Sequence, residues 1–387
     1  MRSNLGFFSD EKFRSIFFQT LVIGLFALGI FFIVNTTAYN LEKRNIATGW
    51  SFLQNPAGFD ISFSPFLEFK STDTHLKVYF VGVLNTLLVS VTGCIAATIL
   101  GFLLGIIRLS SNWLLSRLVY IYVEFSRNVP LLLQIILWYS ILIQLPRVKQ
   151  SLQVLDVFYI SNRGLYSPRP IFESGFSYVL IAIVLALISS FLISRWSKKR
   201  QDNTGQQFPV FSSSIGLIFI VPLILFFILG SPMSFEHPEL KGFNFKGGLV
   251  IRPEFIAMFL ALSIYTAAFI SEIVRAGIMS VSKGQREASA AIGLKQTWIM
   301  RLIIIPQALR VIVPPLTSQY LNLTKNSSLG IAVGYADLVH GFGGISLNQT
   351  GQAIECMVIV MATYLTISLT ISFFMNIYNR SIQFKEK

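Results

Sequence analysis

The feature that most restricts how this chain can fold is the segment 78–107, which runs for thirty residues without a charged side chain. A helix of about 20 apolar residues crosses the roughly 30 Å hydrocarbon core of a bilayer, so this segment is long enough for a tilted span. Of all residues in the chain, 53% are hydrophobic and 13% are charged, whereas about a quarter are charged in soluble domains. The sequence therefore indicates an integral membrane protein.

Seven further apolar segments meet the same length criterion. They are 16–34, 118–145, 176–193, 214–229, 255–276, 302–323 and 353–377. We therefore predict an all-α integral membrane protein of about eight transmembrane helices. The segment 16–34 is also compatible with a signal peptide, but it is long for one and no A-x-A site follows it, so we favour an uncleaved helix.

The segment 118–145 differs from the others because it contains Glu124, Arg127 and Pro130. Proline is tolerated in the first turn of a helix. We therefore expect an amphipathic helix along the cytoplasmic surface, followed by a crossing that begins near Pro130.

Small residues recur at every fourth position within 78–107, at Gly93, Ala97, Gly101 and Gly105. They line one helix face with minimal side chains, which allows a neighbouring backbone to approach closely. Glycine is also common in membrane helices for no specific reason. Both interpretations fit the pattern, and we favour close packing.

The basic residues predict the orientation of the chain. The formal net charge is +13, and lysine and arginine cluster in 108–117, 195–200 and 283–301, between apolar segments. Positive residues retain loops in the cytoplasm, which places these clusters and both termini on that side and makes 195–209 a cytoplasmic loop. The opposite side receives three longer polar segments, 36–77, 146–175 and 230–253. No basic face interleaved with exposed aromatic residues appears, so we expect no nucleic-acid partner.

The sequence lacks the motifs that common enzyme chemistries need. It contains neither a G-x-x-x-x-G-K-[ST] phosphate-binding loop nor a G-x-S-x-G nucleophile elbow. Cys94 and Cys356 fall in apolar surroundings, where we expect small buried side chains. The histidines are too far apart in sequence to suggest a metal site. We therefore expect no catalytic residue, no cofactor and no metal in this chain.

The predicted cytoplasmic segment of about 280–301 carries residues at fixed spacing that continue into the next span. They are Glu287, Ala288, Ser289, Gly293, Leu294, Ile303 and Pro306. Residues 287–292 should form a short helix with small residues on one side, which Gly293 ends in a left-handed turn. Such a helix suits insertion into a groove of a partner, although an ordinary amphipathic connector has a similar composition.

The spacing resembles the EAA signature of ABC-importer permeases, in which E-A-A, three residues, glycine, nine residues and I-x-L-P recur. Ser289 stands at the third position and Ile305 at the leucine position, both mild departures. The resemblance implies docking of a separate ATPase. The residues that it assigns to this coupling loop are Glu287, Ala288, Ser289, Gly293, Leu294 and Pro306.

The resemblance extends over roughly 78–145 and 254–380 to the permeases of polar and general L-amino-acid uptake. It is carried by motifs that begin at Asn85, Arg108, Tyr122, Ala268, Pro306 and Lys325. It implies a type I importer core of five helices. The additional residues resemble the longer permeases of general amino-acid importers. This gives an N-terminal helix and periplasmic segment in 1–77, a permease domain in 78–380 with an insertion of about 146–253, and a cytoplasmic tail in 381–387.

The resemblance also implies a function and a set of partners. The chain would form the translocation pathway for L-amino acids in the bacterial inner membrane, by alternating access. A second permease subunit, identical or homologous, an ATP-binding-cassette ATPase that holds ATP and Mg, and a periplasmic amino-acid-binding protein would complete the importer.

Several polar residues in or beside the spans are candidates for the substrate pathway, because charges in a bilayer usually face a bundle interior or a water-filled cavity. They are Glu272, Arg275, Asn322, Lys325, Asn326, Ser327, Asn85 and Gln134. Glu272 and Arg275 are three residues apart, so a structural ion pair explains them equally well. The polar stretch from Lys325 offers groups for a zwitterionic ligand, but an ordinary helix end has the same composition.

Two other classes of function fit the composition. An ion-coupled secondary amino-acid transporter would need no ATPase, but no internal repeat or matching pair of interrupted helices is visible. A membrane scaffold would tolerate loss of the charges within its spans.

Overall fold

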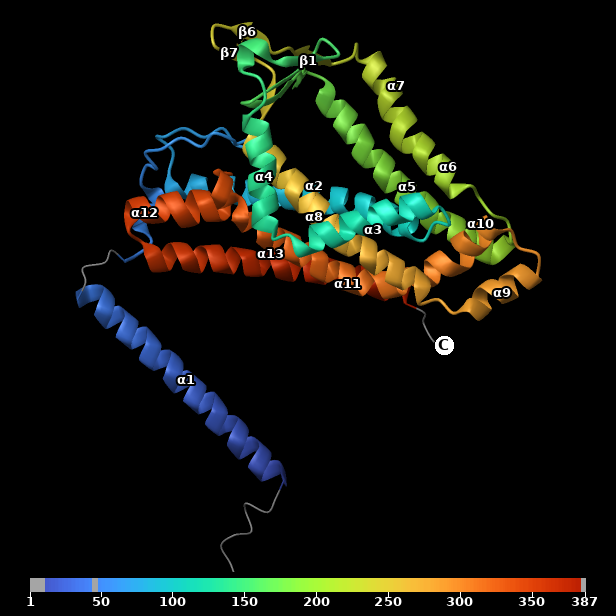
Figure 1. The fold of residues 1–387 in the computed structure, drawn as a ribbon, viewed down its shortest axis with the longest axis horizontal. Helices are drawn as coiled ribbons and strands as arrows, with labels where there is room; N and C mark the ends of the chain where they lie inside the picture. The colour runs from blue at the N-terminus through green and yellow to red at the C-terminus, as the bar shows by residue number, and fades with distance from the viewer. Residues whose placement is uncertain (1–10, 44–47, 384–387) are drawn as a thin grey trace, which may run out of the picture. The chain divides into compact units, whose positions relative to one another are not determined.

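The computed structural model describes residues 11–43 and 48–383, and its chain forms two compact units (Figure 1). One unit combines Met1–Ile136 with Met258–Lys387, and the other is Leu137–Ala257. The helices are α1 (Glu11–Lys43), α2 (His75–Arg108), α3 (Trp113–Asn128), α4 (Leu131–Ile143), α5 (Phe176–Thr204), α6 (Val210–Ile215), α7 (Val221–Ile228), α8 (Pro253–Met279), α9 (Lys283–Ala291), α10 (Gln296–Ile299), α11 (Ile305–Asn326), α12 (Leu347–Thr350) and α13 (Ala353–Ile382).

The predicted membrane class is confirmed. Within the described residues, seven helices are long and apolar enough to cross a bilayer, or eight if the bent pair of α3 and α4 counts as one span. The signal-peptide segment of the prediction lies within α1, a continuous helix of 33 residues.

The bend between α3 and α4 is 107°, and it falls at Pro130 as predicted. Proline removes a backbone donor, so carbonyl groups of the preceding turn lose their helical partners. The buried side chain of Gln134 replaces them, since its Nε2 donates to Ser126 O and to Val129 O, each at 3.0 Å. A polar side chain thus stabilises the break in an apolar setting.

The small residues of α2 form a contact face, so close packing is the correct interpretation. A Cβ added at Gly101 would lie 2.5 Å from Ile270 Cγ2, and one at Gly105 would lie 2.8 Å from Val274 Cβ, both on α8. At Gly93 the nearest atom would be Leu323 Cδ2 of α11, at 3.3 Å. Hydrogen in place of a side chain therefore sets the spacing between α2 and α8.

The prediction of a loop over 195–209 is wrong for most of its length. Helix α5 continues to Thr204 and ends at Gly205, whose φ is +71°. The basic cluster therefore lies on the last turns of a helix. Lysine and arginine have high helix propensity, so a transmembrane helix can continue through them beyond the membrane.

The second unit contains short antiparallel strands that the sequence did not predict. Four of them form one sheet in the order β1 (Leu152–Val154), β2 (Phe158–Ser161), β3 (Gly164–Ser167) and β8 (Leu249–Ile251). Two further two-stranded antiparallel sheets pair β4 (Arg169–Phe172) with β5 (Met233–Glu236), and β6 (Glu239–Lys241) with β7 (Asn244–Lys246). This unit contains the whole predicted insertion of about 146–253.

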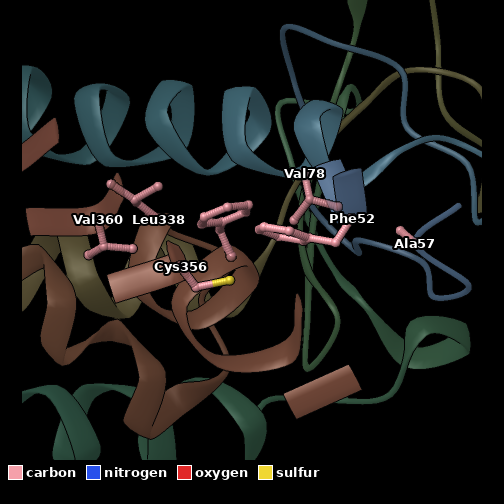
Figure 2. Packing of buried hydrophobic residues seen from close by; sticks show 7 residues of the cluster. Phe52, Ala57, Val78, Leu338, Cys356 and Val360 are labelled. Carbon is pink, nitrogen blue, oxygen red and sulfur yellow. The ribbon is translucent and has the colours of Figure 1, made fainter. Parts of the chain in front are cut away.

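A buried cluster joins the segment before α2 to the last third of the chain (Figure 2). Figure 2 shows Phe52, Val78, Leu338 and Cys356 directed toward one another. The predicted burial of Cys356 is confirmed, and Cys94 is half-buried on α2.

Candidate functional site

The predicted coupling helix is present as α9, between the long helices α8 and α11. It begins at Lys283, one turn earlier than the sequence predicted, and runs to Ala291. Glu287 and Ala288 are exposed, and the side chain of Ile292 at its C-terminal end is 76% exposed. An exposed isoleucine beside alanines on a loop helix is an apolar surface without cover in this chain.

The end of α9 has the geometry that the sequence predicted. Gly293 has a φ of +83°, its N–H donates to Ala290 O at 2.9 Å, and Leu294 N donates to Ser289 O at 3.2 Å. These two bonds form a Schellman motif, which requires a residue in the left-handed region. A Cβ on Gly293 would meet nothing within 4 Å. Glycine is therefore needed here for backbone conformation and not for space.

One of the two departures from the EAA pattern, Ser289, fits this geometry. Ser289 is buried, and its Oγ donates to Gln285 O within the same helix, which satisfies the hydroxyl that alanine lacks. Pro306 matches the pattern and lies in the first turn of α11. Helix α10 and a π-helical turn, Met300–Ile304, lead into α11 without a break, and proline supplies no backbone N–H to that continuous helix.

Glu272 and Arg275 form an ion pair on α8, and α2 adds a third partner. Arg275 Nε donates to Glu272 Oε1 at 3.2 Å, and Arg108 Nη1 donates to Glu272 Oε2. The guanidinium of Arg108 also lies 5.2 Å from the ring centre of Tyr120 on α3. The geometry supports a structural pair that connects α2 with α8, and a role in the substrate pathway stays a prediction.

Asn85 and Gln134 direct their amide groups at backbone carbonyls. Asn85 is buried, and its Nδ2 donates to Phe63 O and to Ala336 O, each at 2.8 Å. Gln134 is occupied at the bend described above. Both side chains therefore stabilise breaks in regular structure, and their predicted contact with substrate stays untested.

The polar residues near the end of α11 are arranged differently from one another. Asn322 and Lys325 are exposed, Asn326 is half-buried and Ser327 is fully buried. Ser327 Oγ donates to Thr324 O at 2.8 Å and lies 3.2 Å from Tyr364 OH on α13. Only the first three present accessible polar groups.

A buried polar network next to Ser327 was missed by the sequence reasoning. Asp337 is fully buried, and its Oδ1 accepts from His340 N at 2.8 Å, while its Oδ2 accepts from Tyr364 OH at 3.3 Å. Thr86 Oγ1 on α2 accepts from Leu338 N at 3.1 Å. Burial raises the pKa of Asp337 to about 7. The network connects α2, the segment after α11, and α13.

A cavity of about 710 Å³ lies between α2, α11 and α13. Most of its wall is apolar, and the hydroxyl groups of Ser90, Thr98, Tyr320 and Thr370 interrupt it. Thr98 Oγ1 lies 2.8 Å from Tyr320 OH and Thr370 Oγ1 donates to Thr366 O at 2.8 Å. Three of these four hydroxyls, those of Thr98, Tyr320 and Thr370, are therefore hydrogen-bonded within the protein.

Comparison with known proteins shows the family. The model of the family "Binding-protein-dependent transport system inner membrane component" matches residues 180–384. The "General L-amino acid transport system permease protein AapQ" of Rhizobium johnstonii is 49% identical over 379 residues, covering 98% of this chain and 94% of the relative. The "Putative amino-acid ABC transporter permease protein YhdX" of Escherichia coli is 46% identical, covering 98% and 97%.

Shorter relatives match as well. The "Probable glutamine ABC transporter permease protein GlnM" of Bacillus subtilis is 32% identical over 224 residues, which are 57% of this chain but 96% of that protein. Nearly a whole short permease thus corresponds to little more than half of this one. The apolar spans agree with these matches, and the chain belongs to the family of inner-membrane permease components of binding-protein-dependent ABC transport systems.

Proposed function

We propose that this permease carries L-amino acids and that α9, with its Gly293 turn, is the surface on which a separate ATPase docks. The observation that carries the docking proposal is an exposed short helix, closed by a Schellman motif, between two long apolar helices. A rigid, small-faced helix of this kind fits a groove in a partner. The amino-acid substrate is supported by the names of the relatives that match almost the full chain.

The chain connection between α9 and α8 would transmit movement of the ATPase to the transmembrane helices. Helix α8 ends at Met279, just before Lys283 begins α9. Glu272 near that end accepts from Arg108 of α2 and from Arg275, so a displacement of α9 moves α8 and, through the ion pairs, α2. Alternating access then follows from relative movement of these helices in the assembled importer.

The tasks of the importer are divided among several polypeptides. ATP and Mg bind to the partner ATPase, because this chain has no phosphate-binding loop. A second permease subunit, identical or homologous, shares the pathway, and a soluble binding protein delivers the amino acid. The protein lies in a bacterial inner membrane, and both of its termini lie on the cytoplasmic side. Of the predicted pathway residues, Asn322, Lys325 and Asn326 are not fully buried, and the same holds for the ion-paired Glu272 and Arg275.

Three substitutions in α9 and its turn test the docking surface. Gly293→Val puts a β-branched residue at a φ of +83°, which that residue avoids, so the turn should lose its geometry. Gly293→Asn is the matched control, because asparagine tolerates this region. We expect Gly293→Val and Glu287→Ala to lower ATP-dependent uptake and recovery of the co-purified ATPase at least 10-fold, and Gly293→Asn to retain most of both.

A second control removes a carboxylate elsewhere on the same predicted side. Asp202 is exposed near the end of α5, and Asp202→Ala should leave ATPase recovery and uptake unchanged. Unchanged uptake and ATPase recovery in both Gly293→Val and Glu287→Ala would contradict the docking proposal. Uptake by the purified chain alone, driven by an ion gradient, would instead support a secondary transporter.

A further inference from the structure

The second unit contains a cleft of about 850 Å³ whose charges all have one sign. Arg147, Lys149 and Arg163 line it, together with Gln150 and Asn162, and no carboxylate is among its lining residues. Arg147, Lys149 and Arg163 are exposed. Like charges that share one cleft repel one another, so their arrangement is most favourable when an anion is present.

Two separate segments carry these cations, Arg147 and Lys149 on one and Arg163 on the other, and backbone contacts fix both segments. Asn162 N in the β2–β3 turn donates to Pro146 O at 2.9 Å, and Gln150 N donates to Arg147 O at 2.8 Å. Gly164 follows the turn with a φ of +122°, and a Cβ there would lie 2.2 Å from Ile251 O. The turn that carries Arg163 is therefore closely packed against β8.

The β6–β7 hairpin forms the third side of the cleft. Its Phe245 packs between two aromatic rings of the sheet, 4.5 Å from Tyr159 and 4.7 Å from Tyr166 between ring centres. At its turn, Phe243 lies 4.3 Å below Lys149 Nζ and remains 78% exposed, while Asn244 Oδ1 accepts from Arg163. The cleft thus combines fixed cations with an exposed aromatic ring.

The carboxylate of Glu239 lies in a neighbouring pocket that shares Lys149 with the cleft. It pairs with Lys241 at 2.9 Å, and this hydrogen bond lowers the pKa of Glu239 and raises that of Lys241. Glu239 is therefore paired within its own strand, and the lining of the cleft itself contains no carboxylate.

From the cleft's charge and its walls we infer that Arg147, Lys149, Arg163 and Phe243 form the docking site for an acidic surface of the soluble binding protein. The inference rests on the proposed function, which gives the importer such a partner, and on the predicted orientation, which puts the segments 146–175 and 230–253 on the side opposite the cytoplasm. A free amino acid would need a small enclosed pocket, whereas this cleft is large and open to exposed residues. Cations around an accessible aromatic ring are typical of protein interfaces.

Charge reversal in the assembled importer tests the inference. Permease, ATPase and the binding protein that restores ATP-dependent uptake are reconstituted in proteoliposomes, and uptake is measured against binding-protein concentration. In the triple variant Arg147→Glu, Lys149→Glu, Arg163→Glu, we expect the half-saturating concentration to rise at least 10-fold, with uptake at saturation retained. Raising the salt concentration should weaken docking of the unmodified permease much more than that of the variant.

Two controls separate the cleft from general charge and from misfolding. Arg169→Glu with Lys246→Glu reverses two exposed cations of the same unit outside the cleft, and should change the half-saturating concentration less than twofold. The milder triple variant with glutamine at the three cleft positions keeps the fold and should give an intermediate increase. Thermal unfolding of each purified variant establishes that its fold is intact.

Several results would overturn the inference. They are an unchanged half-saturating concentration in both triple variants, an equal effect of the Arg169 and Lys246 control, and a change confined to the amino-acid concentration needed for uptake. Loss of binding to anionic lipid vesicles without any change in docking would assign the cleft to headgroups. Failure of the proposed function looks different, because excess binding protein rescues the cleft variant but does not rescue Glu287→Ala.

Discussion

At the scale of single residues, the buried carboxyl of Asp337 gives the fold a testable pH dependence. It is fully buried, and burial raises its pKa from 3.8 to about 7. The folded protein therefore holds this proton more tightly than the unfolded chain does. Linkage then requires that the stabilisation from the protonated carboxyl is complete below about pH 4 and is lost as the pH rises to about 7.

Replacing Asp337 with asparagine should remove this pH dependence. In Asp337→Asn the amide oxygen can still accept from His340 N, which the carboxylate accepts at 2.8 Å, so the turn keeps its cap. We expect the thermal midpoint of the variant to fall less between pH 4.5 and 7.5 than that of the unmodified protein, as measured in detergent. Parallel curves for the two proteins would show that this carboxyl stays ionised in the fold.

Asp73 provides a control of opposite sign. The hydrogen bond from Lys77, at 2.8 Å, lowers the pKa of Asp73. A depressed carboxyl stabilises the fold above its unfolded pKa and loses that contribution as the pH falls through the folded value. Asp73→Asn should therefore lower the midpoint slightly at neutral pH and have no effect in acid.

The contrast between Asp337 and Gly293 explains which site residues were predictable. Gly293 was predictable because a local motif fixes its role, and the left-handed turn depends only on neighbours in sequence. Asp337 was not, because only its bond from His340 N is local, whereas its bond from Tyr364 of α13 and its full burial depend on tertiary packing. The spacing of residues in the sequence does not predict such tertiary contacts.

At the scale of helices, the glycine face of α2 predicts a graded response to added methyl groups. A Cβ would lie 2.5 Å from Ile270 Cγ2 at Gly101, 2.8 Å from Val274 Cβ at Gly105 and 3.3 Å from Leu323 Cδ2 at Gly93. Overpacking typically costs about 1 to 3 kcal/mol. We expect Gly101→Ala and Gly105→Ala to lower the thermal midpoint clearly, and Gly93→Ala to lower it least, because the end of a leucine side chain can move.

A glycine with open space supplies the control for that series. A Cβ on Gly24 of α1 would meet nothing within 4 Å, and Gly24→Ala should leave the midpoint unchanged or raise it, since alanine favours helix. Equal losses at Gly93 and Gly101 would mean that α2 and α8 are not in close contact in the membrane.

The elements that were predicted and those that were missed differ in the range of their interactions. The length of the apolar segments predicted the spans, and Pro130 predicted the position of the 107° bend between α3 and α4. Both effects depend on residues that are close in sequence. The strands of the second unit have three or four residues each, and β3 pairs with β8 across more than eighty intervening residues. No periodic pattern develops over so few positions.

At the scale of the whole molecule, the sides on which the two termini lie depend on whether the bent pair of α3 and α4 crosses the membrane. Helix α4 has 13 residues, which is about 20 Å of helix at 1.5 Å per residue and shorter than a bilayer core. With this pair as one span the chain has eight crossings, and without it the chain has seven. Eight place both termini on the same side, whereas seven place them on opposite sides.

Single cysteines and a membrane-impermeant maleimide distinguish these arrangements. Glu11 and Gln383 are exposed near the two ends of the described chain, and Phe243 is exposed in the second unit. We expect Phe243→Cys to react in intact cells, and Glu11→Cys and Gln383→Cys to react only after the membrane is permeabilised. The unsubstituted chain should stay unlabelled in intact cells, because Cys356 is buried and Cys94 lies within α2. Labelling of one terminus alone in intact cells would establish an odd number of crossings, and the positive-inside argument would then hold for only one half of the chain.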